Sequence, residues 1–171
     1  EATKAREKDK EIVFPTWANH LLCDTDGKYP AEMNDWERAV VEAESKREGF
    51  KFWYRNPQQP GQSSLGIAYL EEEQYKIVRP DFVFFAEQDG KVVVDLVDPH
   101  GLHFADALPK LQGLALYAET QADAYRRIES VAETGGKLRV LDLTRADIRN
   151  AVKDAASAKG LYEGAWASDY E

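Results

Sequence analysis

The chain has 171 residues, of which 43% are hydrophobic and 11% aromatic, so it can bury the core of a globular domain. No apolar run approaches the roughly 20 residues that a membrane-spanning helix needs, and one cysteine, Cys23, excludes an internal disulfide and a multi-cysteine zinc site. The formal net charge of −9 argues against a protein that binds nucleic acid mainly by bulk electrostatics. We therefore expect a cytoplasmic protein without membrane contact.

Residues 1–171 are expected to form a single domain, in which the charged segment 1–11 is a flexible arm or linker. The chain begins with Glu1, and its single methionine is Met33. We therefore expect a fragment of a longer protein, with further domains attached to it.

The first half of the chain predicts one helix followed by strands. Apolar positions at helical spacing predict a helix over about residues 32–48, which stops at Gly49. Aromatic and basic residues alternate over 50–56 and apolar residues alternate over 64–70, so these two segments predict a β-hairpin. After a turn, residues 75–85 predict a third strand.

The second half predicts a helical crossover between two further strands. A fourth strand is expected over residues 91–97, and a helix that Asp106 caps is expected to continue, with or without a break, to Gly135. A fifth strand is expected over 137–143. A helix between two strands of one sheet makes them parallel neighbours, so the fourth and fifth strands should lie side by side.

A last helix is predicted to run to about Ala158, because Thr144 and Asp147 have the spacing of a capping box. The complete order is helix, three or four strands, helix, strand, helix. This order predicts an α/β fold with a mixed central sheet flanked by helices.

Two acidic residues stand inside segments that otherwise read as buried strands. Pro80 has no backbone N–H to donate to a neighbouring strand, so this strand lies at a sheet edge or carries a β-bulge there. Either arrangement changes the direction in which the side chain of Asp81 points. Asp95 stands between valines and a leucine in the next strand. A buried carboxylate has to be protonated, paired or metal-bound. We expect the two acids to converge on adjacent strands and to bind Mg²⁺ or Mn²⁺.

Purely structural interpretations of these acids remain open. Asp81 can pair with Arg79, which lies on the same strand face, or with Arg55. Asp98, which precedes a proline, is interpreted as a turn residue. If Asp81 pairs with one of these arginines, the protein is a structural α/β interaction domain.

The chain resembles the PD-(D/E)xK nuclease superfamily, whose core runs α-β-β-β-α-β. More closely, it resembles the C-terminal nuclease-like region of bacterial helicase-nucleases related to the restriction subunit of type III restriction enzymes. The resemblance spans Trp36 to Leu143 and is carried by FWYRNP, SLGIAYL, RPDFVFF, DLVDPHG and ADALPKLQGLALYAE. It implies a restriction-endonuclease-like, metal-dependent DNA endonuclease domain. It also implies a role in restriction or phage defence, with DNA and a fused or associated helicase/ATPase as partners.

Carried over by motif position, Asp81 is the first metal-binding acid and Asp95 is the second, with the carbonyl of Leu96 as a further ligand. The lysine that the superfamily has two residues after the second acid is replaced by Val97. Some members move this lysine to the following helix, where Lys110 stands. A surface lysine paired with a neighbouring acid is the alternative interpretation of Lys110.

Further residues are candidates by their place near these acids. His100, soon after the fourth strand, is a candidate general base, and Arg55 and Arg79 are candidates for DNA contact at the rim. Some members use an extra acid from the first helix, for which the candidates are Glu37, Glu42 and Glu44.

The missing lysine keeps a second function open. A nuclease fold that has lost catalysis can still guide or dock DNA. Val97 in the lysine position is the feature that favours this alternative.

Overall fold

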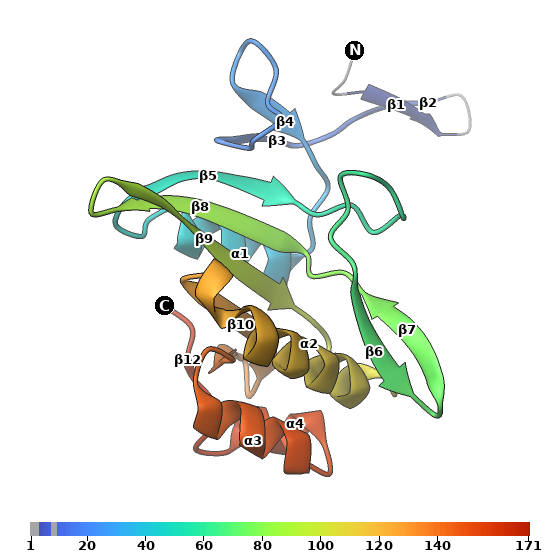
Figure 1. The fold of residues 1–171 in the computed structure, drawn as a ribbon. Helices are drawn as coiled ribbons and strands as arrows, with labels where there is room; N and C mark the ends of the chain where they lie inside the picture. The colour runs from blue at the N-terminus through green and yellow to red at the C-terminus, as the bar shows by residue number, and fades with distance from the viewer. Residues whose placement is uncertain (1–3, 8–9) are drawn as a thin grey trace.

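The computed structural model describes residues 4–7 and 10–171 (Figure 1). Its helices are α1 Asp35–Glu44, α2 Ala107–Gln121, the short 3₁₀ helix η1 Ala122–Ala124, α3 Ala146–Asp154 and α4 Ala158–Glu163. Its strands are β1 Lys4–Glu7, β2 Lys10–Val13, β3 Thr16–Ala18, β4 Lys28–Pro30, β5 Phe50–Arg55, β6 Ile67–Glu71, β7 Gln74–Val78, β8 Phe82–Gln88, β9 Lys91–Pro99, β10 Arg127–Thr134, β11 Lys137–Asp142 and β12 Ser168–Asp169.

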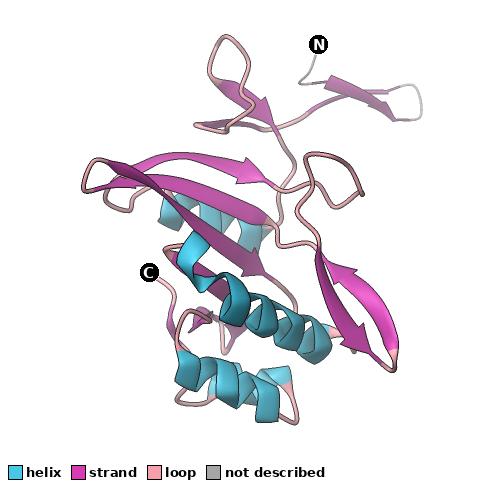
Figure 2. Ribbon diagram, viewed as in Figure 1, coloured by secondary structure: helices cyan, strands magenta, loops and turns pink. Residues whose placement is uncertain are grey.

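A six-stranded sheet organises the fold, with the strand order β12-β11-β10-β9-β8-β5. The pair β9–β10 is parallel, and the other pairs in this sheet are antiparallel. Helices lie on both sides of the sheet (Figure 2). The predicted α/β fold with a mixed central sheet is therefore confirmed.

Each face of the sheet carries its own hydrophobic core. On one face, Val40 and Val41 of α1 pack with Trp53, Phe82 and Phe84. On the other, α2, α3 and α4 cover a second cluster, which includes the buried residues Leu96, Leu111, Leu114, Ile128, Leu141, Ile148 and Leu161. We call these the α1 face and the α2 face.

The register of β8 against β9 sorts their side chains between the two faces. Directly opposed residues of an antiparallel pair point to the same face, and successive residues alternate. Phe84 lies opposite Asp95, and Val83 lies opposite Leu96. Phe84 belongs to the core of the α1 face, whereas Val83 and Leu96 pack in the core of the α2 face. Asp95 therefore points to the α1 face.

The first predicted helix is confirmed as α1. Asn34 and Glu37 form a capping box, in which each side chain accepts a hydrogen bond from the other residue's backbone N–H. The helix ends at Glu44, and a turn leads to Gly49, whose φ of 76° suits glycine.

The predicted hairpin between residues 50–56 and 64–70 is wrong, because β5 pairs with β8 and β6 pairs with β7. β5 places the fully buried Trp53 opposite Phe84 in the core of the α1 face. A non-local aromatic pair thus determines the partner of β5, and the β6–β7 hairpin is an insertion between β5 and β8.

The predicted third strand, residues 75–85, divides into β7 and β8 at Arg79–Asp81. Pro80 has no backbone N–H to donate to a sheet ladder. Its carbonyl accepts a hydrogen bond from the side chain of Asn56 at 2.8 Å. The break separates the hairpin from the central sheet.

The helix predicted to continue from Asp106 to Gly135 ends at Gln121, and β10 takes the last part of this segment. Ile128 packs on the α2 face and Val131 on the α1 face, so both sides of β10 are buried. The parallel pairing with β9 outweighs the local helical pattern. The predicted crossover helix is confirmed, but it joins β9 to β10. The strand predicted over 137–143 is β11, Lys137–Asp142, which is antiparallel to β10.

The predicted capping box at the last helix is wrong. Thr144 donates its hydroxyl to Asp142, and Asp147 pairs with Arg145. Arg145 is the N-cap of α3 and makes no side-chain cap. The helix expected to run to about Ala158 is present as α3, but it ends at Asp154, and a separate helix, α4, begins at Ala158.

The predicted N-terminal arm includes residues 1–3 and 8–9, which lie outside the described residues. Its remaining part forms the hairpin β1–β2. Within residues 4–7 and 10–171, no helix has the length and apolar character needed to cross a membrane.

Candidate active site

The Pro-Asp segment is held by one buried amide. The side chain of Asn56 is 1% exposed and donates to the carbonyls of Leu65 and Pro80 at 2.9 and 2.8 Å. Its backbone N–H donates to the carbonyl of Asp81 at 2.8 Å. These bonds fix the place where β8 begins.

Asp98, and not Asp95, is the acid that lies beside Asp81. The pairing of Phe82 with Val97 puts Asp81 and Asp98 opposite each other at the next position, on the α2 face. The backbone N–H of Asp81 donates to Oδ1 of Asp98 at 3.2 Å. The amide of Gln58 donates to Oδ1 of Asp81 at 2.9 Å.

A cavity of about 190 Å³ opens at this carboxylate pair. Its other lining residues come from the loop after β5, from β7 and the segment after it, from β9 and its end, and from α2. They are Gln58, Ile77, Val78, Arg79, Pro99, His100 and Lys110.

The pKa values of Asp81 and Asp98 are both raised, chiefly because burial disfavours the charged carboxylates. The charge of Glu37 raises the pKa of Asp81 further, and the charge of Asp81 raises that of Asp98. The charge of Lys110 lowers both pKa values. Its ammonium is also paired with another carboxylate, that of Asp106, at 2.7 Å. The pKa is raised to about 7 for Asp81 and to about 8 for Asp98, so both carboxyls are ionised at pH 7 only where a further cation stabilises their charge.

His100 lies two residues after Asp98, at the position where the superfamily motif has lysine. Its Nδ1 lies 3.1 Å from Oγ of Ser130 and 3.7 Å from Oδ2 of Asp98. Burial lowers the pKa of His100 to about 4, so its imidazole is neutral at pH 7. Within the described part of the chain, its buried Nε2 has no hydrogen-bond partner.

The prediction that Asp81 and Asp95 converge is wrong. Asp95 is 1% exposed on the α1 face, where Arg126 donates to it through Nε at 2.9 Å and Arg127 through Nη2 at 2.8 Å. Burial alone would raise the pKa of Asp95, but these hydrogen bonds hold it below its usual value. Asp95 and Asp98 are separated by an odd number of positions along β9, so their side chains point to opposite faces of the sheet.

The predicted carbonyl ligand changes with this correction. Leu96 is buried on β9, between its neighbours β8 and β10. Pro99 follows Asp98 and lines the cavity, so the motif position that was expected of Leu96 falls on Pro99. With Asp98 as the second acid, the residue in the lysine position is His100 and no longer Val97.

A signal in the sequence could have identified Asp98. Asp89-Gly90 is a typical two-residue hairpin turn, and it puts Gln88 opposite Lys91. Counting outward from this pair puts Asp81 opposite Asp98. The prediction from sequence assigned Asp95, the first acid of β9, to the site, because Asp98 precedes a proline and was interpreted as a turn residue.

The other predicted site residues are only partly brought together. Arg79 lines the cavity, and its Nε donates to Oγ of Ser64 at 3.2 Å. Arg55 instead binds Glu37 on α1, with 2.6 Å between Nη2 and Oε1. The structure therefore does not bring Arg55 to the cavity with the other candidates.

The three acids predicted on the first helix have different surroundings. Glu37 is paired with Arg55, and the negative charge of Glu37 raises the pKa of Asp81. Glu44 is buried on the α1 face and binds Arg127, and Glu42 is exposed. Glu37 is thus the acid of α1 that acts on the candidate site.

The carboxylate pair fits a hard divalent cation. Mg²⁺ commonly takes one or two carboxylates and completes its shell with water and substrate phosphate. Within the two described ranges of the chain, no group of three or more His, Cys, Asp and Glu side chains has the arrangement of a metal site. Asp81 and Asp98 are the two carboxylates that line the cavity.

A family model called YagJ family matches residues 18–171. The chain belongs to the YagJ family. It is 68% identical over 171 residues to "Protein YagJ" of Escherichia coli (strain K12), and the match covers all of this chain and 70% of that protein. No solved structure matches the chain at a significant level.

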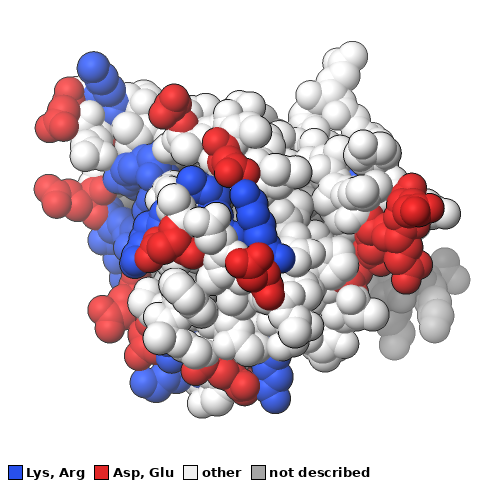
Figure 3. Space-filling model, turned by 60° about the horizontal axis from the view of Figure 1, so that its bottom comes forward, with Lys and Arg blue, Asp and Glu red and all other residues white. Residues whose placement is uncertain are grey.

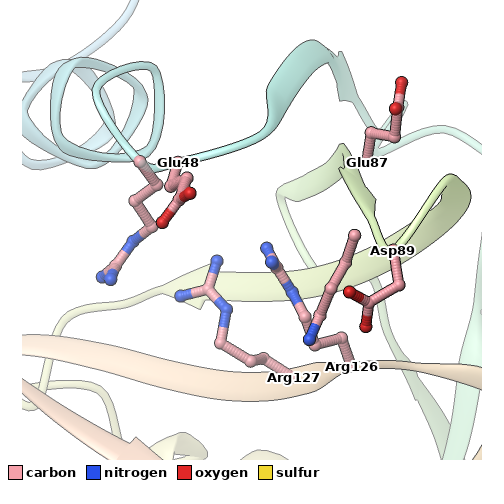
Figure 4. Close-up of a pocket in the computed structure, with 7 residues that line it drawn as sticks. Glu48, Glu87, Asp89, Arg126 and Arg127 are labelled. Carbon is pink, nitrogen blue, oxygen red and sulfur yellow. The ribbon is translucent and has the colours of Figure 1, made fainter.

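This YagJ-family chain has a larger cavity away from the carboxylate pair. Its volume is about 720 Å³, and it lies beside the start of β10 and the β8–β9 turn (Figure 4). The arginines that line it are already engaged, since Arg126 and Arg127 bind Asp95 and Arg47 binds Glu44. Its remaining lining residues are Glu48, Glu87, Gln88 and Asp89.

Proposed function

We propose that this chain is a metal-dependent deoxyribonuclease domain of the PD-(D/E)xK type, with Asp81 and Asp98 as its metal-binding acids. The observation that carries the proposal is the cross-strand carboxylate pair, which is withdrawn from water, mutually repulsive and open to a cavity. Such a pair is either protonated or neutralised by a cation, and groups of this kind concentrate at functional sites.

The element order supports the proposal. Without the inserted β6–β7 hairpin, the elements α1, β5, β8, β9, α2 and β10 follow the α-β-β-β-α-β order of the superfamily. The pair of acids lies at the start of β8 and the end of β9, and the cavity beside it is lined by Lys110 of α2.

Each residue of the cavity has a role that its chemistry suits. A bound Mg²⁺ or Mn²⁺ supplies Lewis acidity toward a phosphodiester oxygen and a water molecule. Asp81 and Asp98 would hold the ion, and Gln58 orients Asp81 through its hydrogen bond. His100, neutral at pH 7, would accept a proton from the attacking water. Lys110 and Arg79 would place positive charge near the phosphate.

DNA affinity is proposed to come in part from a fused or associated helicase/ATPase, in a cytoplasmic restriction or phage-defence system. The net charge of −9 supports this division of labour. On the face drawn in Figure 3, basic side chains lie among acidic ones and do not form an uninterrupted basic surface.

A cleavage assay tests the proposal. Labelled single-stranded and plasmid DNA are incubated with the protein in Mg²⁺ or Mn²⁺, and Asp81→Asn and Asp98→Asn are expected to reduce cutting on the order of 100-fold or more. Asp147→Asn, at an exposed acid of α3, is the matched control and should leave cutting unchanged. Full activity of either site variant would remove that residue from the mechanism.

The second candidate function is a DNA-guiding or docking module without catalysis. The observation that favours it is the neutral His100 at the lysine position, together with the pairing of Lys110 to Asp106. Metal binding at the carboxylate pair without any DNA cleavage would support this candidate over the nuclease.

A further inference from the structure

Ser130 continues the row of polar side chains that begins with Asp81 and Asp98. It stands opposite Asp98 in the parallel register of β9 and β10, and two residues after Ile128, so its side chain points to the α2 face. The row therefore runs from the start of β8 across β9 to β10. Ser130 is fully buried, so its hydroxyl lies beside the carboxylate pair but out of contact with solvent.

The hydroxyl of Ser130 lies at one nitrogen of His100. Nδ1 of the imidazole is 3.1 Å from Oγ of Ser130, 3.4 Å from the backbone carbonyl oxygen of Asp98 and 3.7 Å from Oδ2 of Asp98. A carbonyl oxygen only accepts hydrogen bonds, whereas a serine hydroxyl can accept or donate. These surroundings favour a proton on Nδ1, which then donates to the oxygens around it.

The other ring nitrogen of His100 is buried and unpaired. Nε2 has no hydrogen-bond partner within residues 4–7 and 10–171. Buried polar atoms without a partner are rare, and each indicates a bound water molecule or a functional role. With the proton on Nδ1, Nε2 carries the basic lone pair of the neutral ring. The ring of Tyr162 packs edge-on against the imidazole, with 5.8 Å between their centroids, and restricts its rotation.

Asp98, His100 and Ser130 do not form a nucleophilic triad. In such a triad the serine and the acid bind opposite nitrogens of the histidine. Here the hydroxyl and the carboxylate lie at the same nitrogen, and Ser130 has no exposed surface from which to reach a substrate. The hydroxyl of Ser130 can therefore act only through the imidazole.

We infer that Ser130 is a positioning residue, which holds His100 with its proton on Nδ1 so that Nε2 takes the proton of the attacking water. The inference rests on the proposed nuclease function, and it names the ring nitrogen that acts there. The water oxygen bonds to phosphorus as the ester P–O bond breaks. Nε2 gains the proton that the water loses, and the leaving oxygen is protonated from solvent.

The tautomer of His100 tests this inference directly. In ¹⁵N-labelled protein at pH 7, long-range proton–nitrogen NMR spectra distinguish a protonated ring nitrogen from one with a lone pair. The chain has three histidines, of which the exposed His103 is an internal reference. We expect His100 to carry its proton on Nδ1. In Ser130→Ala the ratio of the Nε2–H form to the Nδ1–H form should rise about fivefold, as the loss of one hydrogen bond predicts.

The cleavage assay gives a second readout. Ser130→Ala should lower kcat on the order of tenfold and leave KM and the Mn²⁺ affinity unchanged, because the hydroxyl acts on the histidine alone. Ser45→Ala is the matched control, since it removes a hydroxyl that donates to the carbonyl of Val41 at the end of α1. This control should change neither the tautomer of His100 nor kcat.

Each contrary result has its own meaning. Unmodified protein that cuts DNA but carries the His100 proton on Nε2 would overturn the inference and leave the nuclease proposal standing. An unchanged tautomer ratio or an unchanged kcat in Ser130→Ala would also overturn it. Unmodified protein that cuts no DNA would overturn both the nuclease proposal and the role of Nε2, whichever tautomer is observed.

Discussion

Two groups of carboxylates lie on opposite faces of the same pair of strands, and they are neutralised differently. Asp95 on the α1 face receives hydrogen bonds from Arg126 and Arg127, and its pKa is held below the usual value. Asp81 and Asp98 on the α2 face repel each other, and their pKa values are raised. The first arrangement serves the fold, and the second favours protonation of the carboxyls unless an external cation stabilises their charged form.

The largest effect on stability is expected from Asp95→Asn. Removing this charge leaves Arg126 without its buried partner, whereas Arg127 keeps Glu44, and breaking a buried pair typically costs about 3–5 kcal/mol. Urea unfolding at pH 7 measures the change. Because the pKa of Asp95 is lowered by folding, its contribution is present above the unfolded pKa and is lost as pH falls through the folded value. A variant as stable as the unmodified protein would contradict the structural role of Asp95.

A smaller effect of opposite sign is expected from Asp98→Asn. The pKa of Asp98 is raised by folding, so its charge costs stability above the unfolded pKa, and the amide removes that cost. The variant should be more stable at pH 7 by on the order of 1–3 kcal/mol. The gain should disappear below about pH 4, where the carboxyl is protonated in both states. Denaturant unfolding across this pH range measures the change. A loss of stability at pH 7 would contradict the conclusion that the charged form of Asp98 destabilises the fold.

The sequence predicted the parts of the fold that depend on local pattern. The helix α1 follows from its cap, its apolar spacing and Gly49, and the mixed sheet follows from a crossover helix among strands. The pairing of β5 with β8 depends on Trp53 and Phe84 meeting across an inserted hairpin. No local pattern contains that information, because the two strands are separated in the chain by β6 and β7.

The candidate site was predicted in part for a similar reason. Asp81, Arg79, His100 and Lys110 all line the cavity, since they lie next to a strand break, just after a strand end or on the following helix. The second acid was misplaced because both acids of β9 suit a buried strand, and only the register distinguishes them. The arginines that neutralise Asp95 lie in a segment that was predicted as helix.

The most direct test of the account is a Mn²⁺ titration followed by electron paramagnetic resonance, at a temperature where all variants are folded. The unmodified protein and Asp95→Asn are expected to bind Mn²⁺ alike, whereas Asp81→Asn and Asp98→Asn should each lose about tenfold or more in affinity. Unchanged binding in Asp98→Asn, or loss of binding in Asp95→Asn alone, would contradict the assignment of Asp81 and Asp98 as the pair that holds the cation.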